Sequence, residues 1–233
     1  MTIPEILKKL ESLGSPENVA GMSHFGITTE KAFGVSAPDL KAIAKDLKKQ
    51  AEGRHELASG LWATRIHEAR ILAYLIDDPK QVTEKQMESW VRDFDNWAIC
   101  DSTCGHLFCR TPVAYEKALD WSKNEELFIK RAGIVMMAWL AVHDKKAGDD
   151  KIAQFLPVLE SSSDDDRNFI KKAVNWSLRQ IGKRNLNLNR LALETADRIK
   201  ERGSRSARWI AVDAERELKG EKVQQRLEKK AAK

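Results

Sequence analysis

The chain has 233 residues, of which 42% are hydrophobic and 32% charged, so it can bury a sizeable core and is too apolar to be disordered. Its 12 glycines and 6 prolines are a low share, which favours helices over a turn-rich β architecture. Three cysteines, an odd number, and no apolar run near the roughly 20 residues of a membrane span argue against a disulfide-stapled secreted protein and a membrane protein. We therefore expect a cytoplasmic protein with no membrane partner.

Helix start signals divide the chain into short helical segments. Ser36-Ala37-Pro38-Asp39 combines a capping hydroxyl with Pro and an acid in the first turn, and Thr83 predicts a similar start for a helix over 84–94. Leu127–Leu140 is the most apolar stretch and predicts a buried central helix. Residues 161–166 form an acidic connector, and Gly203-Ser204 separates the last two predicted helices. No alternating strand pattern stands out, so the predicted fold class is all-α.

A weak repeat runs through these helices. Similar segments surround Ala69, Ala132, Ala173 and Ala207, at spacings of about 63, 41 and 34 residues. Such spacing predicts a HEAT-like α-solenoid of antiparallel helical pairs whose concave side forms a groove. We expect one repeat domain over residues 1–219 and a basic, disordered tail over 220–233, because the tail has little apolar content.

Positive charge is concentrated near the C-terminal end. Residues 167–213 hold twelve basic and four acidic side chains, together with Trp176 and Trp209. Such a block can attract a polyanion by releasing condensed counterions, although a solvated helix face would have the same composition. Within it, Lys172, Trp176, Arg179 and Lys183 follow one helix face and form a basic stripe with one aromatic residue.

Two further pairs share a helix face by their spacing. When the repeats are superposed on their alanines, Arg131 and Trp176 occupy positions four residues apart and would face the same groove. Trp97 and Asp101 are four residues apart in one segment. This pair has two explanations. Either Asp101 is a capping or core carboxylate and Trp97 packs in the core, or the two side chains form a site that holds a cationic centre.

Four motifs occur in order along the chain: Phe33–Pro38, Asn96–Asp101, Lys130–Ala132 and Lys171–Arg179. With this order and spacing, the chain from about Phe25 to Arg208 resembles the AlkD-like DNA alkylation repair family. The resemblance implies a HEAT-like solenoid that binds duplex DNA in its groove and releases N3- or N7-alkylated purines.

The resemblance also implies a catalytic cleft of Trp97, Trp176 and Asp101, with Arg131 beside it. Asp101 would stabilise positive charge on the deoxyribose and orient the attacking water, while the two indoles pack on the sugar and backbone. Arg131 would hold a flanking phosphate. The groove would grip the backbone and need no base-flipping pocket. Candidate phosphate contacts are Lys172, Arg179, Lys183, Ser204, Arg205, Ser206 and Arg208.

No cofactor or metal is expected. Cys100, Cys104 and Cys109 lack the CxxC pair of a zinc site, and small apolar packing explains them better. The expected partner is double-stranded DNA with alkylated bases, bound by a monomer. Two alternatives remain open: a non-catalytic protein of the same fold that binds damaged or branched DNA, and a protein–protein scaffold.

Overall fold

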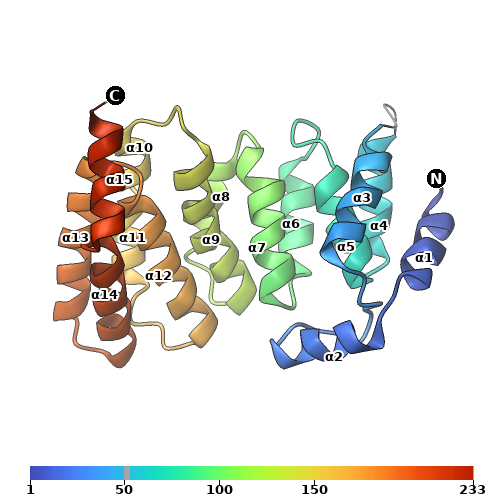
Figure 1. Cartoon of the computed structure of the whole chain (residues 1–233), viewed down its shortest axis with the longest axis horizontal. Helices are drawn as coiled ribbons and strands as arrows, with labels where there is room; N and C mark the ends of the chain where they lie inside the picture. Colours follow the sequence, from blue (N-terminus) through green and yellow to red (C-terminus); the bar gives the residue numbers. More distant parts are fainter. Residues whose placement is uncertain (50–52, 233) are drawn as a thin grey trace. The chain divides into compact units, whose positions relative to one another are not determined.

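The computed structural model describes residues 1–49 and 53–232 (Figure 1). Helices account for 72% of the chain, and the described residues contain no strand, which confirms the all-α prediction. None of the described helices is both long enough and apolar enough to cross a bilayer. The chain divides into two compact units, unit 1 over Met1–Val113 and unit 2 over Ala114–Lys233, where we expected a single repeat domain over residues 1–219.

Unit 1 contains seven α-helices and one short 3-10 helix in its described part. They are α1 (Ile3–Ser12), α2 (Pro16–His24), α3 (Ala37–Leu47), α4 (Arg54–Ala63), α5 (His67–Ile76), α6 (Glu84–Arg92), α7 (Trp97–His106) and η1 (Phe108–Arg110). Helix α5 contacts α3, α4 and α7 and is the centre of the unit. The Trp62 and Trp90 rings stack at 4.0 Å between α4 and α6 and anchor the core.

The chain between α2 and α3 is fixed by a buried carboxylate. Glu68, on α5 and only 1% exposed, accepts hydrogen bonds from the backbone N–H groups of Phe33 at 3.0 Å and Gly34 at 2.7 Å. Gly34 has φ +77°, and a Cβ there would lie 2.3 Å from the Ser15 carbonyl oxygen, so only glycine fits. Ser36 then caps α3 by accepting from the Asp39 N–H, as the sequence predicts.

Unit 2 contains eight α-helices in its described part. They are α8 (Ala114–Trp121), α9 (Leu127–His143), α10 (Asp149–Ala153), α11 (Leu156–Ser161), α12 (Asn168–Gly182), α13 (Leu186–Glu201), α14 (Arg205–Leu218) and α15 (Glu221–Ala231). Helix α9 packs against α8 and α12 and is buried along most of its length, which confirms the predicted central helix. Gly133 permits this packing, because a Cβ there would lie 2.3 Å from the Ser122 nitrogen after α8.

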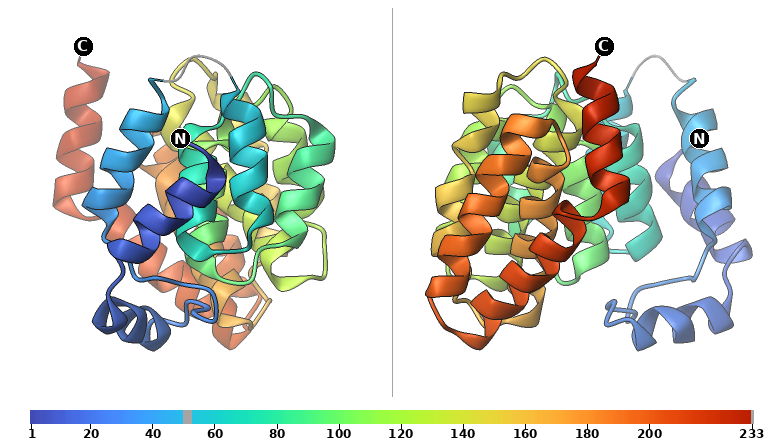
Figure 2. Two further views of the ribbon diagram at one scale, coloured as in Figure 1. Left: turned by 90° about the vertical axis from the view of Figure 1, so that its right-hand side faces the viewer. Right: turned by 60° about the vertical axis from the view of Figure 1, so that its left-hand side comes forward.

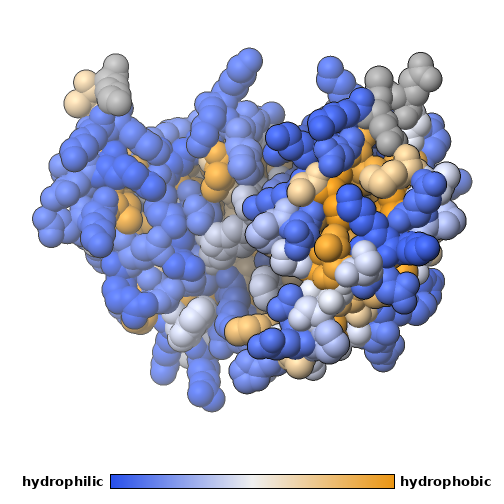
Figure 3. All heavy atoms as spheres, turned by 45° about the vertical axis from the view of Figure 1, so that its right-hand side comes forward, coloured by the Kyte–Doolittle hydropathy of each residue, from blue (hydrophilic) through white to orange (hydrophobic). Residues whose placement is uncertain are grey.

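The alanines that define the repeat are all buried. Ala69 lies in α5, Ala132 in α9, Ala173 in α12 and Ala207 in α14, and none is more than 1% exposed. Burial of all four agrees with the repeat pattern. Figure 3 shows apolar side chains between the helices of unit 1 and mostly charged or polar ones on unit 2.

The tail prediction is wrong for residues 221–231, which form α15. This helix lies beside α13 and α14 (Figures 1 and 2). Leu227 is its one fully buried residue, and Gln224 donates to the Leu218 carbonyl oxygen at 2.5 Å. A single buried apolar residue is a weak sequence signal for a docked helix. Much of the docking of α15 comes from polar contacts to backbone carbonyls, which only the folded chain brings within reach.

Candidate nucleic-acid interface

Helix α7 presents Trp97 and Asp101, both half-buried. Asn96 caps the helix by accepting from the Ile99 N–H at 3.0 Å, which makes Trp97 the first helical residue. The Trp97 indole N–H donates to the Phe25 carbonyl oxygen at 3.0 Å, so the chain after α2 fixes the ring. Asp101 follows one turn later on the same face, as the spacing predicts.

Two cysteines of α7 are buried. Cys100 and Cys104 are both fully enclosed, and burial raises the pKa of the Cys104 thiol well above its usual value, with a smaller contribution from the charge of Asp101. Both thiols lie in the core of unit 1. Among the described residues, no group of three or more His, Cys, Asp or Glu side chains is arranged to hold a metal ion.

Arg131 lies inside unit 2. Its side chain on α9 is only 6% exposed, and its guanidinium donates to the Phe169 carbonyl oxygen in the first turn of α12. The guanidinium carbon is also 5.8 Å from the centre of the Phe169 ring, a cation–π distance. Arg131 therefore ties α12 to α9 in this conformation, and its contact with a phosphate stays a prediction.

Trp176 is half-buried on α12, with buried neighbours on either side of it in the sequence. Ser177 donates to the Ile134 carbonyl oxygen of α9 at 2.7 Å, and Asn175 donates to the Ile210 carbonyl oxygen of α14 at 3.2 Å. These two bonds fix the rotation of α12 about its axis. The Trp176 ring packs edge-to-face on Trp139, with centroids 5.4 Å apart.

The predicted basic stripe is partly paired with acids. Lys183 Nζ lies 2.6 Å from a Glu217 carboxylate oxygen, and Arg179 binds the same carboxylate. Burial opposes ionisation of Glu217, but the hydrogen bonds from Lys183 and Arg179 outweigh it and hold the pKa below its usual value. Lys172 is exposed and makes no ion pair within the described part of the chain. Contacts of these cations with phosphate remain predictions. To make them, Arg179 and Lys183 would have to bind a phosphate while Glu217 competes for the same side chains.

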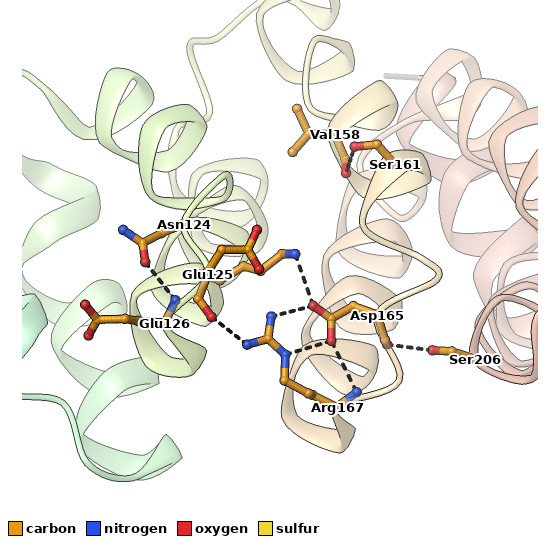
Figure 4. Close-up of polar contacts among 9 residues, drawn as sticks. Asn124, Glu125, Glu126, Val158, Ser161, Asp165, Arg167 and Ser206 are labelled. Carbon is orange, nitrogen blue, oxygen red and sulfur yellow. Dashed lines mark hydrogen bonds and ion pairs between the residues drawn. The ribbon is translucent and has the colours of Figure 1, made fainter.

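The start of α14 carries the other predicted DNA contacts. Ser204 caps this helix by accepting from the Ala207 N–H at 3.1 Å. Arg205 and Arg208 are exposed and unpaired among the residues that the structure describes. Ser206 is 5% exposed, and its only hydroxyl proton is donated to the Asp165 carbonyl oxygen at 2.9 Å (Figure 4). In this conformation the Ser206 hydroxyl has no proton left for a phosphate.

Asp165 organises the acidic connector between α11 and α12 (Figure 4). Its carboxylate accepts from Arg167 at 2.9 Å and binds Lys130 Nζ of α9 at 3.0 Å, while Arg167 also donates to the Glu125 carbonyl oxygen at 2.7 Å. The hydrogen bond from Arg167 lowers the pKa of Asp165 to about 2, against burial and with help from Lys130. This network ties the connector to Lys130, the residue before Arg131 on α9, and to the chain just before α9.

Sequence reasoning did not single out the pairing of Lys171 and Trp209. Lys171 Nζ of α12 lies 5.0 Å from the centre of the Trp209 ring on α14, and the indole is 41% exposed. The concentration of basic residues with Trp176 and Trp209 was the only signal, and it did not show which cation meets which ring. The pair adds a surface indole and a cation to unit 2.

The described residues form an all-helical fold of the HEAT-like repeat class, with an indole and a carboxylate on one face of α7 and exposed basic residues on unit 2. The chain matches the model of the family described as "DNA alkylation repair enzyme" over residues 6–218, and it therefore belongs to that family. Helix α15 lies beyond the matched residues.

A solved structure has a similar fold. The protein is described as one of "a new family of proteins related to the HEAT-like repeat DNA glycosylases with affinity for branched DNA structures". The two chains are 22% identical, the alignment covers 94% of this chain and 96% of the other, and the TM-score is 0.76. A search of curated protein sequences found no match.

Proposed function

We propose that this protein is a monofunctional DNA glycosylase that releases N3- and N7-alkylated purines from duplex DNA. Trp97 and Asp101 carry the proposal, because they share one face of α7 in a member of the DNA alkylation repair family and both reach the surface. Trp97 is also held by the Phe25 carbonyl, so the indole is positioned before DNA binds.

The chemistry requires little from the protein. Alkylation at N3 or N7 leaves the purine positively charged, so when the C1′–N bond breaks its electron pair neutralises the departing base and no general acid is needed. Positive charge develops on the deoxyribose, and Asp101 stabilises it electrostatically. A water oxygen then bonds to C1′, and its proton passes to Asp101 or to solvent. Trp97 and Trp176 pack on the sugar and backbone, with their ring faces toward the positive charge.

Base flipping has no role in this proposal. The protein grips the backbone around the lesion, and the base leaves without entering a pocket, which suits bulky adducts. Lys172, Arg205 and Arg208 support this part of the proposal, because they are exposed and make no ion pair within the described residues.

The test measures release of 7-methylguanine from methylated duplex DNA, above the spontaneous rate. We expect Asp101→Asn to slow release by about 10²-fold or more while the affinity for DNA is kept, because the carboxylate acts only as charge develops. The control is Asp46→Asn, which removes an exposed carboxylate from α3 of the same unit. Equal rates for Asp101→Asn and the wild-type protein would remove Asp101 from the mechanism.

A second candidate is a non-catalytic protein that binds branched DNA. The similar solved structure is described as having affinity for branched DNA, which favours this candidate. The burial of Arg131 also favours it, because a buried guanidinium does not reach a flanking phosphate in this conformation. Affinities for a four-way junction and for a linear duplex of equal length separate the two proposals. No adduct release, with preference for the junction, supports the second candidate, and no salt-sensitive binding to either DNA leaves the scaffold alternative.

A further inference from the structure

Unit 2 contains a second cationic feature, a cavity of about 390 Å³ where α15 meets the ends of α9 and α12. Its volume falls within the roughly 300–1,000 Å³ of small-ligand pockets. Five basic residues line it together with one acid, Asp149, and they are Lys145, Lys183, Arg184, Arg226 and Lys230. We call this cavity the α15 pocket.

The fold itself positions these cations. Arg184 donates to the carbonyl oxygens of Ala141 at 2.8 Å and Ala147 at 2.6 Å. From α15, Arg226 donates to the Lys183 carbonyl oxygen at 3.1 Å, and Lys230 donates to the Arg184 carbonyl oxygen at 3.2 Å. These carbonyls end helices α9 and α12 or follow them, where cations are favourable. Because a guanidinium has five donors and an ammonium three, several N–H groups stay available to a ligand.

The charges in the pocket are not balanced. Lys183 is paired with Glu217, and both carboxylate oxygens of Asp149 accept from amide groups, of Asn185 at 2.7 Å and Asn187 at 2.8 Å. Lys145 makes no ion pair in the part of the chain that the structure describes. Burial lowers the pKa of Lys230, and the neighbouring charges of Arg226, Lys145 and Arg184 lower it further. A bound anion would relieve this repulsion.

We infer that the α15 pocket binds a phosphate group. Phosphate carries negative charge that offsets part of the surplus, and its oxygens accept the paired donors that a guanidinium presents. The phosphate belongs either to a DNA backbone or to a free phosphate compound. Arg226 and Lys230 lie on α15, beyond the residues that the family model matches, whereas Lys145, Lys183 and Arg184 lie within them. The inference goes beyond the proposed function, because it requires no adduct release.

The experiment compares two triple variants of the full chain. The pocket variant is Lys145→Gln, Arg226→Gln, Lys230→Gln. The control is Lys146→Gln, Lys222→Gln, Lys229→Gln, which removes the same charge from exposed residues of the same two segments outside the pocket. Binding of undamaged duplex DNA is measured across a range of salt, and binding of inorganic phosphate is measured by calorimetry. Urea unfolding of both variants checks that α15 still folds.

We expect the pocket variant to bind DNA about tenfold more weakly than the control at 0.1 M salt, with a salt slope lower by about one. This result assigns the pocket to a DNA phosphate. Equal DNA affinities with inorganic phosphate binding lost only in the pocket variant assign it to a free phosphate compound. Identical behaviour of the two variants in both measurements overturns the inference. Because the DNA carries no lesion, none of these outcomes depends on glycosylase activity.

Discussion

Each unit uses a carboxylate to hold an irregular segment, buried for Glu68 and half-buried for Asp165, but the two carboxylates have different partners. In unit 1, Glu68 accepts from consecutive backbone N–H groups before α3, which are neutral donors. In unit 2, Asp165 binds the cations of Lys130 and Arg167. The segment before α3 is held through its backbone N–H groups, whereas the acidic connector before α12 is held by ion pairs. The stability of unit 1 at this point should therefore resist salt, and that of unit 2 should depend on charge.

The same difference applies to the proposed DNA contacts. Unit 1 contributes an indole and a carboxylate whose positions depend on backbone contacts. Unit 2 contributes cations, several of which already have acidic partners. Under the proposed function, catalysis would depend on precise placement of side chains in unit 1, and affinity for DNA would depend on the balance of charges in unit 2. The four predictions below test this contrast, from the largest expected effect to the smallest.

Replacing Glu68 by Gln should have the largest effect. The amide NH₂ group would face backbone N–H groups that now donate to the carboxylate, so buried donors would lose their acceptor. We expect the free energy of unfolding to fall by about 3 kcal/mol. Urea unfolding at low and at high salt measures the effect. A loss that disappears at high salt would contradict the contrast between the units.

Asp165→Asn should have a smaller effect that depends on pH. The pKa of Asp165 is about 2 in the folded protein, below the usual 3.8 of an unfolded chain, so its contribution to stability is present above about pH 4 and is lost as the pH falls through 2. We expect the variant to be about 1–2 kcal/mol less stable at pH 7. Urea unfolding at pH 7 and at pH 2 should show this difference shrinking, and a constant difference would refute the ion-pair account.

Glu217→Gln should free Lys183 for DNA and leave Arg179 with only its 3.9 Å ion pair with Asp213 among the described residues. Without its carboxylate, Arg179 and Lys183 lose their shared partner, and if they reach phosphates the affinity for duplex DNA should rise several-fold with a steeper salt dependence. The control is Glu228→Gln, an exposed acid of α15 whose loss changes the net charge equally. An equal rise in both variants would mean that the affinity responds to the net charge of the protein and not to the release of these two cations.

The smallest expected effect is a difference in stability between variants of the two candidate indoles, Trp97 and Trp176. Trp97→Phe removes the hydrogen bond to the Phe25 carbonyl and should lower the free energy of unfolding by about 1 kcal/mol. Trp176→Phe removes an indole with no hydrogen bond among the described residues and should cost about half as much. Thermal unfolding of both variants gives the comparison, and the reverse order would contradict the positioning of Trp97 by Phe25.

Several predictions from sequence are confirmed because they depend on local chemistry. The start of α3 at Ser36-Ala37-Pro38, the cap at Thr83 and the apolar helix after residue 127 all require only neighbouring residues. The shared face of Trp97 and Asp101 follows from helical spacing alone. The roles of these two residues in catalysis remain predictions.

Other features came from residues far apart in the chain. Arg131 was expected at a phosphate, but its guanidinium donates to a carbonyl 38 residues away, and Ser206 donates to one 41 residues away. The pairing of Arg179 and Lys183 with Glu217 spans a similar distance. Composition showed the excess of basic residues but could not show which of them have partners.

The sequence by itself determined the helical class, the caps, the repeat of buried alanines and the family, because each depends on the residue types at short spacing. Only the tertiary structure decided which cations are paired, which hydroxyl is already used and that residues 221–231 form α15. Hydrogen bonds and ion pairs act over a few ångströms, and the folding of the chain, not its order, sets which groups come within that range.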